Sequence, residues 1–240
     1  MRRSEISTTL VLVWVWILLG IAAVAVFAWY SAKQRREAMQ QRAENLGFTY
    51  VPNDPYLLER FAALGDPFDR GFGRRATNIL VGSSVGRPAI AWDYSYKIRG
   101  SQRNTGTTTH HLGIVCVEAG LVMPRISVLP DGVVSRDIGA LLGSDVQYDV
   151  SQVRDQEFNR TFTVTSAQPS FANELLDAGM TEFLLFHPHE GFKIDGTQVM
   201  RISPGHLRPE DMQSALAYLD GVLDRIPYHV RRTLRPLDQG

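Results

Sequence analysis

The feature that most constrains this chain is an uncharged apolar run near its start. Residues 10–30 read LVLVWVWILLGIAAVAVFAWY and contain no Asp, Glu, Lys or Arg. As an α-helix that rises 1.5 Å per residue, the run would be about 31 Å long, which matches the hydrocarbon thickness of a bilayer. It is longer than the roughly 7–15 apolar residues of a cleaved signal peptide. We therefore predict a transmembrane helix over residues 10–30 that stays in the mature protein, after a short N-terminus of residues 1–9.

Aromatic and cationic side chains flank the apolar run. Tryptophan and tyrosine rings settle at the two membrane–water interfaces, and they stand near both ends of the run. The cations that follow the run are more densely clustered than Arg2 and Arg3 before it, and such clusters are retained in the cytoplasm. We therefore predict a cell-membrane protein with a cytoplasmic C-terminal domain; a signal anchor with the domain outside is the alternative. The predicted interface residues are Trp14, Trp16, Trp29, Tyr30, Lys33, Arg35 and Arg36.

The chain after the apolar run divides into three parts. Residues 31–47 are rich in helix-forming Ala, Gln, Arg and Glu, and Gly47 provides a C-terminal stop, so we predict a helical stalk. Residues 48–228 have the length of one globular domain, and residues 229–240 form a basic tail. The stalk is too short to establish heptads, so a homo-oligomer through it stays open. A formal net charge of zero gives no reason to expect nucleic acid as a partner.

Strand patterns dominate the first half of the domain. Residues 76–81 and 88–98 flank a hairpin loop, GSSVGR, and apolar residues from Ile90 to Tyr96 recur at every second position, which predicts one buried face. Two further strands are expected in HLGIVCVEA and PRISVLPDG, so the sheet should be an antiparallel meander. Before it, residues 48–51 should form a short strand, and Asp54 should cap a helix that opens at Pro55.

The last third of the domain mixes strands with helices. Phe158, Phe162 and Val164 would share one face of a strand over residues 157–166, and helices are expected in 169–178, 180–186 and 208–226. Asp195 and Gly196 stand between two alternating segments and suit a two-residue type I′ hairpin turn. A short helical turn is expected at residues 138–142. The predicted fold class is α+β: an N-terminal transmembrane helix plus one antiparallel-sheet domain covered by helices.

Three phrases of this last third occur in a recognisable order. FNRTFTVTS is followed by ANELLDAGMTEFLL and then by FKIDGTQVMRIS, over residues 157–202. The order resembles an uncharacterised family of bacterial membrane-anchored α+β domains, in which F-N-x-x-F-x-V-x-S precedes a Leu-rich helix and a hairpin ending in G-x-x-L-x-I. Met200 and Ile202 stand where that ending has Leu and Ile. The resemblance implies a membrane-associated α+β domain of unknown function and brings no catalytic residue with it.

Candidate catalytic and metal-binding side chains do not form a known motif. His187 and His189 flank a proline and His206 lies further on, but no HExxH spacing occurs, and the adjacent His110 and His111 would point to opposite faces of a strand. We therefore predict no metal and no cofactor. Cys116, the only cysteine, lies in an apolar strand and is expected to be a buried hydrophobic residue. Neither a GxSxG elbow nor a phosphate loop is present.

The absence of clustered acid, base and nucleophile favours a non-enzymatic role. We predict an interaction or scaffold domain that is anchored in the lipid bilayer and binds an unidentified protein partner. A membrane-bound enzyme whose site forms only in the fold is one alternative, and a lipid or small-ligand binding domain is another. The candidate enzyme residues are His187, His189 and Asp93. Those for contact with anionic lipid are Arg231, Arg232 and Arg235 in the tail, together with Lys33, Arg35 and Arg36.

Overall fold

The computed structural model describes residues 2–100, 106–131 and 156–236 and divides the chain into two compact units. The first unit is Met1–Gln41 and the second is Arg42–Gly240. Helix α1 (Arg2–Leu46) provides all the described structure of the first unit, and its last turn belongs to the second. The helical turn expected at residues 138–142 lies outside the described residues.

Helix α1 is long and apolar enough to cross a membrane. Within Trp14–Leu46, an 18-residue window has a mean hydropathy of 2.0, and none of that window is buried. From Trp14 to Tyr30 its large apolar side chains are exposed, as a lipid-facing helix requires. The helix ends where Gly47, with φ of +71°, takes up the left-handed conformation of a C-terminal stop, which confirms that prediction.

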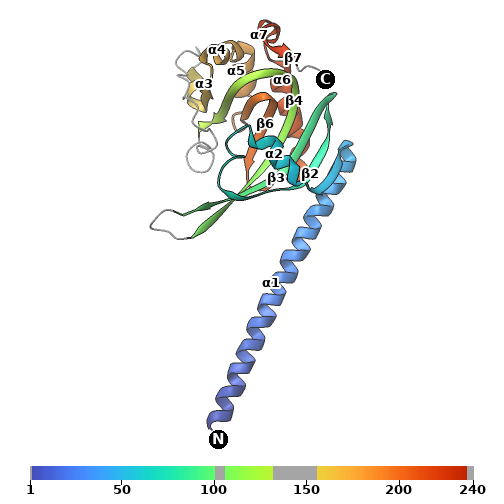
Figure 1. Ribbon diagram of the computed structural model, residues 1–240, viewed down its shortest axis with the longest axis vertical. Coiled ribbons are helices and arrows are strands. Elements are labelled where there is room, and N and C mark those ends of the chain that lie inside the picture. Colours follow the sequence, from blue (N-terminus) through green and yellow to red (C-terminus); the bar gives the residue numbers. More distant parts are fainter. Residues whose placement is uncertain (1, 101–105, 132–155, 237–240) are drawn as a thin grey trace. The chain divides into compact units, whose positions relative to one another are not determined.

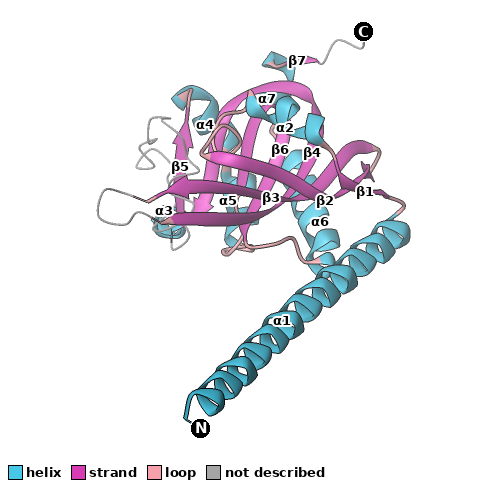
Figure 2. Cartoon of the chain, turned by 60° about the horizontal axis from the view of Figure 1, so that its bottom comes forward, coloured by secondary structure: helices cyan, strands magenta, loops and turns pink. Residues whose placement is uncertain are grey.

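The second unit is built on one antiparallel sheet (Figures 1 and 2). Strands β1 (Thr49–Asn53), β2 (Phe72–Ser84), β3 (Arg87–Arg99) and β4 (Thr107–Pro130) pair in sequence order, as the predicted meander requires. Strand β5 (Phe162–Ser166) continues the order, and β6 (Phe192–Pro204) and β7 (Arg235–Pro236) both pair with β4. The predicted α+β fold class is confirmed.

Strand β4 unites two segments that the sequence predicted as separate strands, so that prediction was wrong. The 24 residues of β4 pair with β3 through their first half and with β5 through their end, while β6 runs along both halves. The register shifts between Glu118 and Met123, and Gly120 there has φ of +69°. The glycine therefore bends a continuous strand instead of reversing the chain.

The predicted hairpin at Asp195 and Gly196 was also wrong. Both residues lie inside β6, which pairs with β4 on either side of them. Gly196 has the positive φ expected of a turn, +60°, but Asp195 does not share it, as a type I′ turn would require. Asp195 instead accepts a hydrogen bond from Arg125 Nε at 2.7 Å, which ties the bend of β6 to β4.

The strand predicted for residues 157–166 is half helix. Helix α3 (Gln156–Thr161) precedes β5, and Phe158 and Phe162 still meet because their rings stack at 5.2 Å. Their spacing explains why the sequence suggested a strand here, since two residues four apart share a helix face as well as a strand face. The other helical segments were predicted correctly: α4 (Pro169–Leu175), α5 (Ala178–Leu185) and α6 (Met212–Asp224), which follows a single 3-10 turn, η5 (Pro209–Asp211).

Helices cover both faces of the sheet. Helix α2 (Pro55–Ala62), capped by Asp54 as predicted, places Phe61 over Trp92 with ring centroids 4.6 Å apart. Trp92, Tyr94 and Tyr96 are fully buried on this face, which confirms the alternation predicted for β3. The intervening Asp93 faces the other side, where α6 packs on β4 and β6.

The segment predicted as a basic tail has regular structure as far as Pro236. Helix α7 (Tyr228–Thr233) is followed by β7, which pairs with Leu121 and Val122 of β4. Arg231 donates hydrogen bonds to the carbonyl oxygens of Leu223 and Ile226, at the C-terminal end of α6. Its guanidinium thus adds side-chain donors to carbonyls at and just beyond the last turn of α6, where helical hydrogen bonding ends.

The bend at Gly196 can be tested by substitution. Open space surrounds the position where a Cβ would lie, so Gly196→Ala isolates the cost of the left-handed backbone. We expect the free energy of unfolding to fall by about 1–2 kcal/mol, measured by chemical unfolding of the full-length protein in detergent. Gly179→Ala, in α5, is the matched control and should leave stability unchanged or raised. Equal effects of the two substitutions would contradict a left-handed residue at 196.

Candidate docking pocket on helix α5

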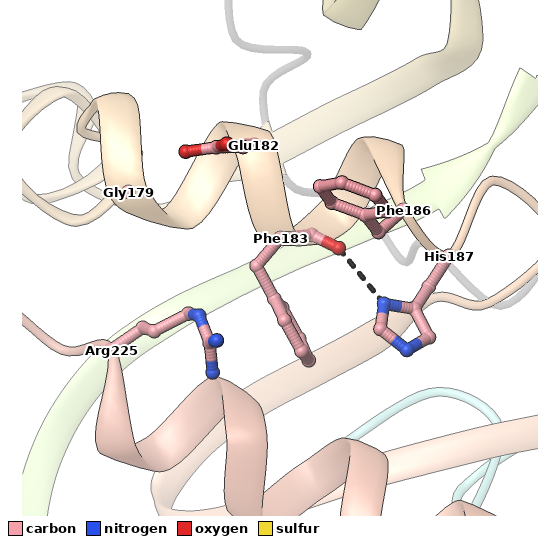
Figure 3. A pocket seen from close by; sticks show the side chains of 6 residues that line it. All are labelled: Gly179, Glu182, Phe183, Phe186, His187 and Arg225. Carbon is pink, nitrogen blue, oxygen red and sulfur yellow. Dashed lines mark hydrogen bonds between the residues drawn. The ribbon is translucent and has the colours of Figure 1, made fainter.

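One face of helix α5 carries an open pocket of about 510 Å³. Asp177 starts the helix by accepting a hydrogen bond from Met180 N at 2.9 Å. Gly179, Glu182, Phe183 and Phe186 then follow at spacings of three and four, which places them on one side of the helix. Figure 3 shows these residues together with His187 and Arg225, which complete the lining; we call this site the docking pocket.

The Phe183 ring forms the floor of the docking pocket and is held from several sides. It stacks on Tyr218 of α6 with centroids 5.7 Å apart, and the Arg225 guanidinium lies 4.1 Å from its centre. Gly221 of α6 lies directly beneath it, and a Cβ there would come within 2.6 Å of the ring. The ring can therefore occupy this place only because α6 has a glycine at that position.

His187 closes one end of the docking pocket. Its Nδ1 lies 2.9 Å from the Phe183 carbonyl oxygen, which can only accept a hydrogen bond, so Nδ1 carries the proton. In the neutral tautomer with this proton, Nε2 is the acceptor atom of the ring. Beyond it, Phe186 is 77% exposed, so a large apolar side chain of the pocket lining faces solvent. The pocket thus offers aromatic faces, a cation, a carboxylate and one imidazole acceptor.

The hydroxyl group of Tyr218 lies buried behind the docking pocket. No hydrogen-bond partner for its oxygen occurs within the part of the chain that the structure describes. Burial raises the pKa of Tyr218 well above its usual value, nearby Glu190 adds to the rise, and Arg201 opposes it. The phenol therefore stays protonated and neutral throughout the physiological range and cannot act as a base.

A second polar cluster surrounds Asp93 on the other part of the sheet. The Asp93 carboxylate accepts hydrogen bonds from Leu207 N at 2.7 Å and from Asn78 Nδ2 at 2.8 Å, and His206 Nδ1 lies 3.5 Å away. His206 in turn packs against His111 with centroids 4.5 Å apart. Desolvation first, and then the neighbouring His206, lower the pKa of His111.

The hydrogen bonds of this cluster hold a loop against the sheet. Asp93 fixes the backbone of Leu207 against the sheet at Gly113, where a Cβ would come within 2.7 Å of Leu207 N. The adjoining cavity of about 230 Å³ includes Ser203, but its hydroxyl donates to the Gly113 carbonyl at 3.1 Å instead of facing an imidazole. Across residues 2–100, 106–131 and 156–236, no three His, Cys, Asp or Glu side chains are arranged so that they could hold a metal ion.

The remaining sequence candidates are dispersed. His110 stacks on Tyr96, and the candidate enzyme residues His187 and Asp93 lie in different sites, so the fold does not bring them together. Cys116 is fully buried, as predicted, and its burial raises the pKa of the thiol. Arg231 is engaged by α6, which leaves Arg232 and Arg235 as the exposed cations of the former tail.

The predicted interface residues lie together on α1. Trp14 and Tyr30 are about 24 Å apart along the axis at 1.5 Å per residue, and both side chains are exposed. Lys33 lies 5.7 Å from the Trp29 ring centre and 3.8 Å from Glu37. Trp16, Arg35 and Arg36 belong to the same helix. Their place at a membrane interface stays a prediction.

The docking pocket was missed by the sequence reasoning, although a signal for it exists. The segment MTEFLLF has more apolar residues than a single buried helix face can hold. Met180 and Leu184 are buried, whereas Phe183 and Phe186 line the pocket on another side of the helix. An excess of apolar residues in a short helix indicates a second, exposed contact surface.

Comparison with known proteins identifies a similar fold. No protein-family model and no curated protein matches the chain. Among solved structures, the chain is similar to the crystal structure of the mycobacterial trehalose monomycolate transport factor A, TtfA, with a TM-score of 0.54. The two are 15% identical over 86% of this chain and 97% of that chain, so the likeness is one of fold.

The close contact between Gly221 and Phe183 predicts an unusual effect of alanine. In a helix, Gly→Ala normally adds up to about 1 kcal/mol of stability, but here the new methyl group must displace the Phe183 ring. We expect Gly221→Ala to lower the free energy of unfolding by about 1–3 kcal/mol, measured by chemical unfolding. Combining it with Phe183→Leu should recover part of the loss. A simple sum of the two single effects would show that they do not touch.

Proposed function

We propose that this protein is a single-pass, membrane-anchored adaptor whose globular domain binds a partner protein at the docking pocket. The observation that carries the proposal is the 77% exposed Phe186 in a pocket that Phe183 and Arg225 also line. Aromatic residues and arginine supply most of the binding energy at protein interfaces, because they bury large areas and also make polar contacts. The pocket contains no nucleophile next to its imidazole, which favours binding over catalysis.

The rest of the chain supports an anchored adaptor. Helix α1 has the length and composition of a membrane span, and the exposed rings of Trp14, Trp16, Trp29 and Tyr30 suit its two interfaces. The structure with a similar fold is described as a transport factor. An adaptor needs a surface for partners more than a catalytic centre, and the docking pocket provides such a surface.

Cross-linking from the docking pocket tests the adaptor function. A photoreactive phenylalanine at position 186 should yield a discrete adduct in intact cells, whereas the same group at Tyr56, 75% exposed on α2, should yield little. Arg225→Glu should weaken the adduct about tenfold, because it removes the cation that lies over Phe183. Equal labelling from both positions would contradict a docking site. An adduct of twice the chain mass would identify a second copy as the partner.

The proposed cytoplasmic position of the domain can be tested at the C-terminus. A green fluorescent protein fused after Gly240 should fluoresce, and an alkaline phosphatase fused there should be inactive, because the Lys33, Arg35 and Arg36 cluster is retained inside. Changing all three cations to Glu should shift a measurable fraction of molecules to phosphatase activity. An active phosphatase in the unaltered chain would place the domain outside.

A further inference from the structure

A small three-stranded arm projects from one end of the sheet. It consists of residues 72–75 at the start of β2, 95–99 at the end of β3 and 107–111 at the start of β4. Figure 1 shows its β3 and β4 strands extending beyond the rest of the sheet. Gly71 allows β2 to begin there, because a Cβ at that position would lie 2.3 Å from the Lys97 carbonyl oxygen. The arm is thus part of the folded sheet.

One face of the arm gathers cations around an aromatic ring. The strand register pairs Phe72 with Lys97 and Arg75 with Ser95, which places these side chains on one face. Arg99 is two residues after Lys97 on β3 and therefore joins the same face. Its guanidinium lies 5.3 Å from the centre of the Phe72 ring, in agreement with that placement. We call Phe72, Arg75, Lys97 and Arg99 the basic face.

The charge of the basic face is not neutralised within the described structure. The arm as defined contains no Asp or Glu, and no ion pair between described residues includes Arg75, Lys97 or Arg99. Elsewhere arginines such as Arg87 and Arg125 are paired with carboxylates. The three cations are exposed, and Phe72 is 42% exposed beside them. In a chain of zero net charge, this is a local excess of positive charge with an apolar centre.

We propose that the basic face binds the anionic phospholipid surface of the membrane that holds the protein. Lysine and arginine attract anionic headgroups while an aromatic ring enters the headgroup region, and the basic face offers both. Each cation contributes about fivefold to such binding, so three contribute about a hundredfold. The inference rests on the membrane anchoring proposed above, because a tether keeps the bilayer at a high effective concentration. It assigns the lipid contact to the arm and not to the C-terminal arginines.

Lipid discs of defined charge provide the test. The full-length protein is reconstituted in discs of phosphatidylcholine alone or with a quarter phosphatidylglycerol. A fluorophore is attached at Thr107→Cys, the β4 residue that pairs with Arg99 of β3. The native Cys116 is fully buried and does not react. Headgroup-labelled quencher lipid should quench this fluorophore in anionic discs only, and 0.5 M salt should reduce the quenching. A fluorophore on Tyr228→Cys, 76% exposed on α7, should show no dependence on lipid charge.

Charge variants determine whether the basic face is responsible. Changing Arg75, Lys97 and Arg99 together to Glu should abolish the quenching, and changing them to Gln should reduce it at least tenfold, which keeps the test valid if the Glu variant misfolds. The matched control changes three other exposed arginines, Arg60, Arg208 and Arg232, to Glu and should keep the quenching.

The possible failures are distinguishable. Quenching that is equal in neutral and anionic discs, or that is unchanged in both the Glu and the Gln variants of the arm, would contradict lipid binding by the basic face. Neither result would contradict the membrane anchor. A chain that does not enter the discs would overturn the anchor as well. Tight binding of a short single-stranded RNA that the Gln variant loses, without quenching in discs, would assign the face to nucleic acid and overturn the proposal.

Discussion

The backbone pairing of strand β4 is the interaction on which the rest of the domain depends. Its 24 residues form hydrogen bonds with β3, β5, β6 and β7, so every part of the sheet except β1 and β2 touches it directly. A strand of this length cannot stay flat against helices on both faces, because sheets twist. The bend at Gly120 and the matching bend at Gly196 let one strand serve two differently oriented halves of the sheet. The arm is the outer end of β4 with its neighbours, and α6 packs along its inner part.

Local patterns predicted the elements well, and their connections less so. The alternation through Trp92 and the cap at Asp54 were recognised because both depend on residues a few positions apart. The errors at Gly120 and Gly196 share a different cause. A glycine with positive φ serves a reversing turn and a bulge equally well, and only the strand opposite decides between them. That strand comes from a distant part of the sequence, which no local pattern contains.

The sites depend on such distant contacts even more strongly. The Phe183 ring needs the missing side chain of Gly221 and the cation of Arg225, both on a helix that follows an intervening strand. Basic residues show the same limit. Arg231 was a sequence candidate for lipid contact, yet its guanidinium donates hydrogen bonds to carbonyls at the end of α6. Arg75, Lys97 and Arg99 come together only through the register of β2 and β3. The sequence indicated that cationic side chains would bind anionic lipid, but the fold determines which of these side chains are exposed and unpaired with carboxylates.

The order of the strands along the chain also determines when the domain can finish folding during synthesis. Strand β4 is synthesised near the middle of the chain, but β6, α6 and β7, which pair with or cover it, belong to the last fifth. These long-range contacts cannot form until nearly the whole chain has left the ribosome. Helix α1 is made first, so under the proposed anchoring it has already entered the bilayer by then. The sheet would therefore complete itself beside the membrane, with the unpaired edge of β4 and its apolar side chains exposed until the final residues arrive. Such a chain depends during that interval on the speed of translation and on any chaperone that covers the open edge.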